Sequence, residues 1–212
     1  MKSQLIVIFF ALGLIPSVAF ARVSIEDLHA QIDSLVNSLV ACPPGPTRFV
    51  DNGDGTICDT QTGLMWEKKD AADGVQDLSN PHDVDNTYTW TNTTDGDNAN
   101  PDGTAFTDFL ARINGITAVS ASSEQLAGYS DWRLPTSAEL QTLLLERYPC
   151  SINPCIIDPI FAPTASDNYW SSTSYGGYPN ATSAWNINFF GYGAALNLKT
   201  FSGYVRAVRG GK

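Results

Sequence analysis

Few residues in this chain of 212 have the type and spacing that catalysis requires. It contains two histidines, His29 and His82, and neither lies beside a serine or cysteine that it could activate as a nucleophile. The zinc-protease sequence H-E-x-x-H is absent. Aspartate pairs occur, but where aspartate is this common a pair only weakly indicates glycoside hydrolysis. The sequence therefore favours a binding protein over an enzyme.

Candidate metal ligands concentrate in an acidic segment, residues 70–111, which contains no Lys, Arg or Glu. Asn98, Asn100 and Asp102 reproduce the first half of a calcium-binding loop, although Phe109 stands where that loop needs an acidic residue. So polar a segment cannot form a core of its own, and it is either solvated or held by Ca²⁺. We favour a solvated loop. A rise in melting temperature in millimolar calcium would establish the alternative. The aspartates of the segment are Asp70, Asp73, Asp77, Asp83, Asp85, Asp95, Asp97, Asp102 and Asp108.

The richest candidate binding surface is the C-terminal segment 169–197, which is dense in Tyr, Trp, Phe, Asn, Ser and Gly. Rigid aromatic rings combined with amide and hydroxyl hydrogen bonds are typical of binding surfaces. Alternation along the strand separates Asn186 from the side that we assign to the core, which carries Trp185, Ile187 and Phe189. The alternative is that the Tyr and Asn residues only form turns and pack the sheet. The residues predicted to contact a ligand fall in turns: Tyr175, Tyr178, Asn180 and Tyr192.

The formal net charge of -10 limits the partners. An acidic surface repels nucleic acid, anionic lipid and polysulfated glycans. A neutral saccharide or a protein surface is therefore the expected ligand, and no nucleic-acid partner is expected.

The first 21 residues have the pattern of a secretory signal peptide. Lys2 precedes an apolar run at 5–15 that is too short to span a bilayer comfortably, and Ala19 and Ala21 form an A-x-A cleavage site. The mature chain should therefore begin at Arg22 and be secreted, periplasmic or attached to the cell surface. N-terminal sequencing of the exported protein tests this, because an uncleaved anchor would keep these residues.

An exported chain with four cysteines is expected to contain disulfides. Three pairings are possible, and the sequence alone does not choose among them. We favour Cys42–Cys58 and Cys150–Cys155 because both pairs are local in sequence. The larger loop should contribute roughly 3 kcal/mol to stability.

Residues 22–47 have the pattern of an amphipathic helix followed by a Pro-rich linker. Ser24 and Asp27 can cap the start of a helix over 24–41, and the Pro-rich run 42–46 ends it. About two heptads are too few for strong self-association, so the helix either packs on its own domain or joins chains into a homo-oligomer. The apolar seam consists of Ile25, Leu28, Ile32, Leu35 and Leu39.

The remaining residues, 48–212, predict an α+β domain. One helix is expected over 104–114, ended by Gly115, and a second should begin at a capping box formed by Thr136 and Glu139. Short strands are expected around glycine-containing turns within 48–66, at 132–134, and in the last third at 168–173, 183–189, 194–199 and 203–210.

Five motifs occur in order along this domain: RFVDNGDGTICDTQTGLMW (48–66), YTW (88–90), GYSDWRLPTSAEL (128–140), NYWSSTS (168–174) and YVRAVRGG (204–211). Together they closely resemble the C-terminal domain family of the Legionella collagen-like protein. More distantly, RLPT before a helix and the closing VRGG resemble the formylglycine-generating enzyme superfamily. That resemblance implies a C-type-lectin-like fold in which the two ends of the domain pair in one sheet. The cysteine pair of those enzymes has no counterpart, because no cysteine follows Cys155.

The resemblance also implies structural roles for four residues. An arginine in such a fold is a planar five-donor group that can hold loop carbonyls and carboxylates, and we favour this role over ligand contact for Arg133. The four residues are Trp132, Arg133, Arg206 and Arg209.

Members of that family are exported or surface-attached, and the founding member is associated with adhesion to sulfated glycosaminoglycans. The acidic charge of this chain argues against that ligand class. The expected function is an exported, non-catalytic binding or adhesion module for a carbohydrate or a protein surface. The alternatives are a structural subunit of a cell-surface assembly and an enzyme whose chemistry these motifs do not reveal.

Overall fold

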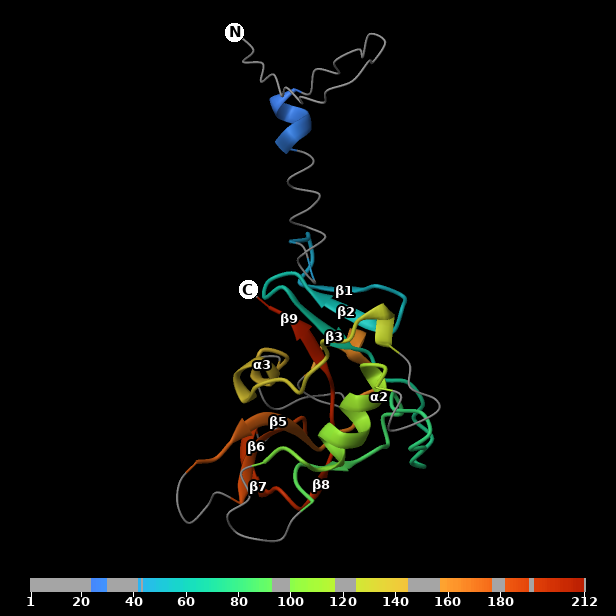
Figure 1. Cartoon of the computed structure of the whole chain (residues 1–212), viewed down its shortest axis with the longest axis vertical. Coiled ribbons are helices and arrows are strands. Elements are labelled where there is room, and N and C mark those ends of the chain that lie inside the picture. Colours follow the sequence, from blue (N-terminus) through green and yellow to red (C-terminus); the bar gives the residue numbers. More distant parts are fainter. Residues whose placement is uncertain are drawn as a thin grey trace, which may run out of the picture.

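The two ends of the domain meet in a four-stranded antiparallel sheet, drawn in the upper part of the domain in Figure 1. The computed structural model describes residues 24–29, 42, 44–92, 100–116, 125–144, 157–176, 182–190 and 193–211. The sheet has the strand order β1-β2-β3-β9, so the third strand pairs with the last. Its strands are β1 (Phe49–Asp51), β2 (Thr56–Asp59), β3 (Leu64–Glu67) and β9 (Val208–Gly210).

Glycine makes the tight turns of this sheet possible. Gly53 and Gly55 lie between β1 and β2 with φ of 77° and 84°, and Gly63 precedes β3 with φ of 74°. A side chain with a Cβ rarely adopts these angles, which explains why the turn motif predicted from the sequence is rich in glycine.

Two smaller sheets complete the strands. β4 (Tyr88–Thr89) pairs with β8 (Ser202–Gly203), and β5 (Asn168–Ser174), β6 (Ser183–Asn188) and β7 (Gly193–Leu198) form a three-stranded antiparallel sheet. The three-stranded sheet lies in the lower part of the domain in Figure 1, with α3 above it. This α+β architecture agrees with the fold class that the sequence predicts.

The helices are short. They are the π-helix η1 (Ala105–Leu110), α2 (Ala111–Ile113), the 3-10 turn η2 (Leu126–Gly128), α3 (Ser137–Gln141) and the 3-10 turn η3 (Pro159–Phe161). The capping box predicted for α3 is present, since the Thr136 side chain accepts from Glu139 N and the Glu139 side chain accepts from Thr136 N. A helical turn at 25–29 begins as predicted, with Ser24 Oγ accepting from Asp27 N, and the rest of the predicted helix lies outside the described residues.

The core consists of two aromatic clusters. One contains Trp90, Trp132 and Trp170, and the other contains Trp66 and Phe161. Each buried tryptophan removes on the order of 200 Å² from water, or about 5 kcal/mol of gross hydrophobic stabilisation. Three of the indoles also bind distant backbone oxygens: Trp90 Nε1 donates to Ser171 O, Trp132 Nε1 to Leu126 O and Trp170 Nε1 to Tyr88 O.

Two predicted strands differ from the structure. Residues 203–210 form β8 and β9 separately, because the intervening Tyr204 pairs with β5 and draws the chain away from a single ladder. The stretch 132–134 is a single bridge, in which Arg133 and Val208 exchange two backbone hydrogen bonds of 2.9 Å. Both departures arise from long-range pairing that local sequence patterns do not specify.

Candidate functional site

Both sides of the three-stranded sheet are buried at its centre, and the sheet is partly exposed to solvent at one end. On one side, Ile187 and Phe189 are buried with Leu140 and Leu143, which lie in and just after α3. On the other side, Asn186 is 1% exposed, and neither atom of its amide group has a hydrogen-bond partner within the described part of the chain. The centre of the sheet is therefore scaffold, and any ligand contact must come from its margin.

That margin carries an aromatic pair. The rings of Tyr175 and Trp185 meet nearly edge to face, with centroids 6.1 Å apart and an interplanar angle of 76°. Trp185 lies opposite Leu196 in the β6–β7 ladder, so their side chains share one side of the sheet. Leu196 is 40% exposed and Leu198 is 46% exposed. We call Tyr175, Trp185, Leu196 and Leu198 the aromatic face.

Trp185 corrects a prediction from the sequence. Alternation assigned it to the core with Ile187 and Phe189, and those two residues are buried, whereas Trp185 is only partly buried. Ile187 and Phe189 belong to the buried cluster that includes Leu140 and Leu143, and Trp185 is not part of that cluster. Periodicity identifies the side of a strand, but it does not show how far the buried cluster on that side extends.

The remaining residues predicted to bind a ligand are not all described. Tyr175 follows β5 and belongs to the aromatic face, while Tyr178, Asn180 and Tyr192 lie outside the described residues. For the predicted calcium loop, Asn98 also lies outside them and Asn100 is exposed. The Asp102 carboxylate accepts from Thr91 Oγ1 (2.7 Å) and Asn92 N (3.1 Å). Among the described residues, no group of three or more His, Cys, Asp or Glu side chains could hold a metal ion.

The predicted Cys42–Cys58 disulfide is present at the N-terminal end of the domain. Cys42 and Cys58 are joined, which ties the start of the Pro-rich run 42–46 to β2. Cys150 and Cys155 lie outside the described residues, so their pairing stays a prediction.

Arg133, Arg209 and Trp132 all brace loops near the ends of the domain. Arg133 donates to both carboxylate oxygens of Glu139, at 2.6 and 2.8 Å, and so supports the capping box of α3. Arg209 donates to Asp131 at 2.7 Å, and its guanidinium lies 3.6 Å from the ring centroid of Tyr129. None of these contacts leads to the aromatic face.

Arg206 differs from the other arginines because it is completely buried. Its Nη1 donates to Glu67 O at 2.7 Å, and its Nη2 lies within hydrogen-bond distance of Phe161 O, Pro163 O and Thr164 Oγ1. The guanidinium therefore joins β3 to the segment around η3. The contacts to Glu67 O and Phe161 O are buried and those to Pro163 O and Thr164 Oγ1 are partly buried, so Arg206 replaces solvent that these oxygens would otherwise need.

A buried ionic cluster lies beside this guanidinium. The Glu67 carboxylate accepts from Lys69 Nζ (2.9 Å) and Ala207 N (3.0 Å), and its Oε1 lies 2.8 Å from His82 Nδ1. Burial alone would raise the pKa of Glu67, but the Lys69 ammonium, His82 and the Ala207 amide outweigh it and lower the pKa to about 2. Sequence reasoning missed this cluster, because charged residues at a strand end are ordinarily solvated.

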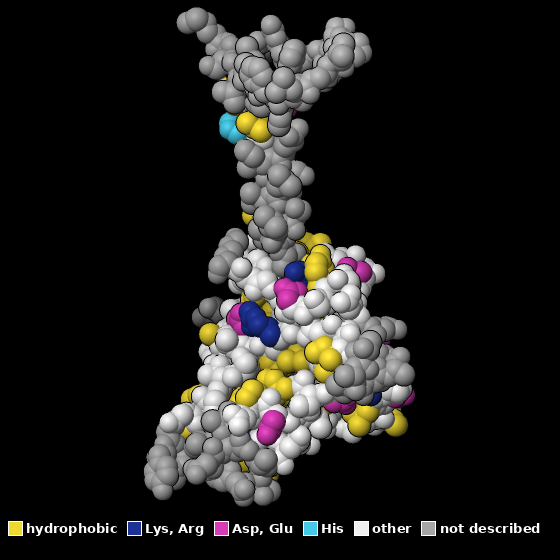
Figure 2. Space-filling model, in the orientation of Figure 1, with side chains coloured by type: hydrophobic (Ala, Val, Ile, Leu, Met, Phe, Trp, Pro, Cys, Tyr) yellow, Lys and Arg dark blue, Asp and Glu magenta, His cyan; other side chains and the backbone are white. Residues whose placement is uncertain are grey.

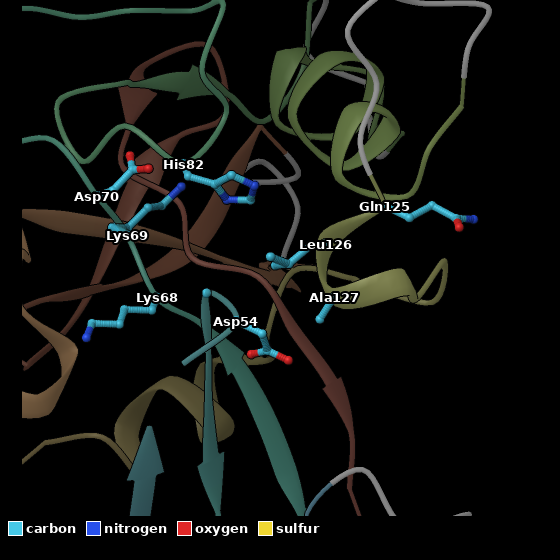
Figure 3. Close-up of a pocket in the computed structure, with 9 residues that line it drawn as sticks. Asp54, Lys68, Lys69, Asp70, His82, Gln125, Leu126 and Ala127 are labelled. Atoms are coloured by element: carbon cyan, nitrogen blue, oxygen red, sulfur yellow. The ribbon is translucent and has the colours of Figure 1, made fainter. Parts of the chain in front are cut away.

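Figure 3 shows a cavity of about 360 Å³ next to this cluster. It is lined by Asp54, Gly55, Lys68, Lys69, Asp70, His82, Gln125, Leu126 and Ala127. In this view the His82 ring lies between Lys69 and the side formed by Gln125 and Leu126. Most of the other charged groups already have partners in the protein, since Lys68 binds Asp51, Lys69 binds Glu67, Asp54 accepts from Thr56 and Asp70 accepts from Asn80. Because so few polar groups remain for a ligand, the cavity is a weaker candidate site than the aromatic face.

Charge is sparse on the side of the domain drawn in Figure 2. Lys, Arg, Asp and Glu side chains lie scattered there, and hydrophobic side chains gather in a hollow near the middle of the domain. The described strands β5, β6 and β7 contain no charged residue at all. The chemistry of the aromatic face is therefore ring stacking and neutral hydrogen bonding, without ion pairing.

Comparison with known proteins identifies the domain. No curated protein matches the chain at a significant level. A family model described as the Lcl C-terminal domain matches residues 55–209, which is well over half of the chain and extends from β2 to β9. The chain therefore belongs to the Lcl C-terminal domain family.

Proposed function

We propose that this protein is an exported, non-catalytic binding or adhesion module that recognises a carbohydrate or a protein surface, and that an uncharged saccharide best fits its aromatic face. The observation that carries this proposal is the partly exposed Tyr175–Trp185 ring pair beside the exposed Leu196 and Leu198. Two fixed rings offer a large apolar contact at low entropic cost.

The charge distribution favours a neutral saccharide. Strands β5 to β7 carry amide and hydroxyl groups but no charged side chain, and the chain as a whole has a net charge of -10. A sulfated or carboxylated glycan would be repelled, and the described strands β5 to β7 offer no cation to hold it. The C–H surface of a neutral sugar ring can stack on Trp185 while its hydroxyls bind uncharged polar groups at the margin of the sheet.

Fold and family membership support the same proposal. Pairing of β3 with β9 joins the two ends of the domain, as a C-type-lectin-like fold would. Membership of the Lcl family favours a surface or secreted location. Within the described residues, no helix has the length and apolar character needed to cross a membrane.

The test is an array of neutral glycans probed with the mature chain and with the Trp185→Ala and Tyr175→Ala variants. We expect the wild type to retain neutral glycans and Trp185→Ala to bind them at least tenfold more weakly, about 1.4 kcal/mol, as for a central aromatic contact. Tyr129→Ala is the matched control, because Tyr129 is 39% exposed and contacts Arg209 instead of the aromatic face. Unchanged glycan binding by Trp185→Ala would show that this face is not the site.

A second candidate function, as a structural subunit of a cell-surface assembly, has its own supporting observation. Ile25 and Leu28, the first two residues of the predicted seam, are 39% and 41% exposed. Light scattering of the mature chain with and without residues 22–41 tests this candidate. A molar mass that falls to one chain on truncation would support it, and an unchanged mass would reject it.

A further inference from the structure

Most strand edges in this domain are covered by other segments. β5 is covered along its outer edge, where Trp170 N donates to Tyr204 O, Tyr204 N donates to Asn168 O and Ser172 N donates to Pro135 O. β9 is covered by Arg133, through the two backbone hydrogen bonds with Val208. An uncovered edge is a row of free amide and carbonyl groups, and proteins ordinarily protect it in this way.

The β1 edge is protected differently. The strand has only three residues, and charged side chains surround it, since Arg48 precedes it and Asp51 binds Lys68. Short length and charge are recognised means of preventing a second strand from pairing there. The two-residue strands β4 and β8 are shorter still.

Within the described residues β7 has none of these protections, although Leu198 O accepts from Phe201 N in the turn that follows the strand. The strand is six residues long and pairs with β6 in one unbroken register from Gly193 to Leu198, without a bulge. Its sequence, Gly-Ala-Ala-Leu-Asn-Leu, contains no charge and no proline. Within the described part of the chain no strand pairs with its outer edge, and Leu196 and Leu198 are exposed beside it. This is the geometry that receives another strand.

We propose that the outer edge of β7 pairs antiparallel with β7 of a second copy of this chain. A two-fold axis through Leu196 makes the pairing self-complementary. It places Leu198 opposite Ala194 of the second copy, and Leu196 opposite its own equivalent, all on one side of the sheet. Leu198 then meets the small Ala194, the two Leu196 side chains meet at the axis, and the uncharged strand lets two acidic chains approach closely.

The pairing has a consequence for binding that rests on the proposed function. A two-fold axis normal to the sheet does not exchange its two sides. The aromatic faces of the two copies therefore lie on the same side of a continuous six-stranded sheet. Two such sites side by side would bind a repeating or surface-bound ligand with greater avidity than one.

The test is sedimentation of the mature chain over about a hundredfold range of concentration, because association by mass action depends on concentration. The variants are Leu196→Lys and Leu196→Glu, each of which places like charges against each other at the two-fold axis. Leu196 is 40% exposed, so both variants should fold, which circular dichroism checks. Val75→Lys, at a position that is 66% exposed in the acidic segment, is the matched control.

We expect the wild type and Val75→Lys to form dimers. Each Leu196 variant alone should associate at least tenfold more weakly. An equimolar mixture of Leu196→Lys and Leu196→Glu should recover association. A wild type that stays monomeric over this range would overturn the proposal. So would Leu196 variants that associate as strongly as the wild type, because the contact would then lie elsewhere, for example in residues 24–41. No glycan is present in this experiment, so its outcome does not depend on the proposed function.

Discussion

Arg206→Met should lower the free energy of unfolding by about 3–5 kcal/mol, which is a large fraction of the stability of an ordinary domain. The guanidinium is completely buried and binds three backbone carbonyls and one hydroxyl, from Glu67, Phe161, Pro163 and Thr164. Methionine fills a similar volume but donates no hydrogen bond. The cost is therefore that of several buried oxygens left without partners, each about 1–3 kcal/mol before the structure relaxes.

Urea unfolding compares this variant with Arg133→Met, which makes the same change at a surface position. The Arg133 side chain is 42% exposed and pairs with the partly exposed Glu139, so its loss should cost about 1 kcal/mol. Equal effects of the two substitutions would show that the Arg206 contacts do not hold β3 to the η3 segment in the way we describe.

Glu67→Gln should be nearly as damaging, at about 3–5 kcal/mol, because it removes the carboxylate that pairs with the buried Lys69 ammonium. The side chains of Glu67 and Lys69 are 0% and 2% exposed, so water cannot compensate. Asp131→Asn is the matched carboxylate-to-amide control. The Asp131 side chain is 60% exposed, and removing its charge should cost no more than about 1 kcal/mol.

The same carboxylate predicts a pH dependence. The pKa of Glu67 falls from 4.5 to about 2 on folding, so its ionisation stabilises the folded state fully above pH 4.5 and loses that effect as the pH falls through 2. The shift corresponds to about 3 kcal/mol at pH 6, of which about 2 kcal/mol should be lost by pH 3. The difference in stability between the wild type and Glu67→Gln should narrow by that amount between pH 6 and pH 3. A difference that stays constant over this range would mean that Glu67 is not the titrating group.

Local sequence patterns predicted the elements whose causes are local. The Thr136–Glu139 capping box, the glycine turns at Gly53 and Gly55 and the strands of the C-terminal sheet all depend on neighbours within a few residues, and all are present. The Cys42–Cys58 disulfide followed from the same preference for short separations.

Features that depend on distant contacts were not predictable in this way. Glu67 and Lys69 are buried only because Ala207 and Pro81, far away in sequence, supply a donor and an acceptor to them. Trp185 is partly exposed because it lies outside the buried cluster of Leu140, Leu143 and Ile187, and the alternation of β6 contains no information about that cluster. The partner of a strand edge is likewise a property of the whole topology. Only the assembled sheet shows that no described strand pairs with the outer edge of β7.

The most direct test of the aromatic face as the binding site is an NMR titration that follows the indole N–H signals of the five tryptophans. Trp66, Trp90, Trp132 and Trp170 are at most 3% exposed, whereas Trp185 lies partly open on the aromatic face. Adding a neutral glycan retained on the array should shift the Trp185 signal, assigned from Trp185→Phe, and leave the other four in place. A glycan that binds while the Trp185 signal stays fixed would contradict the account.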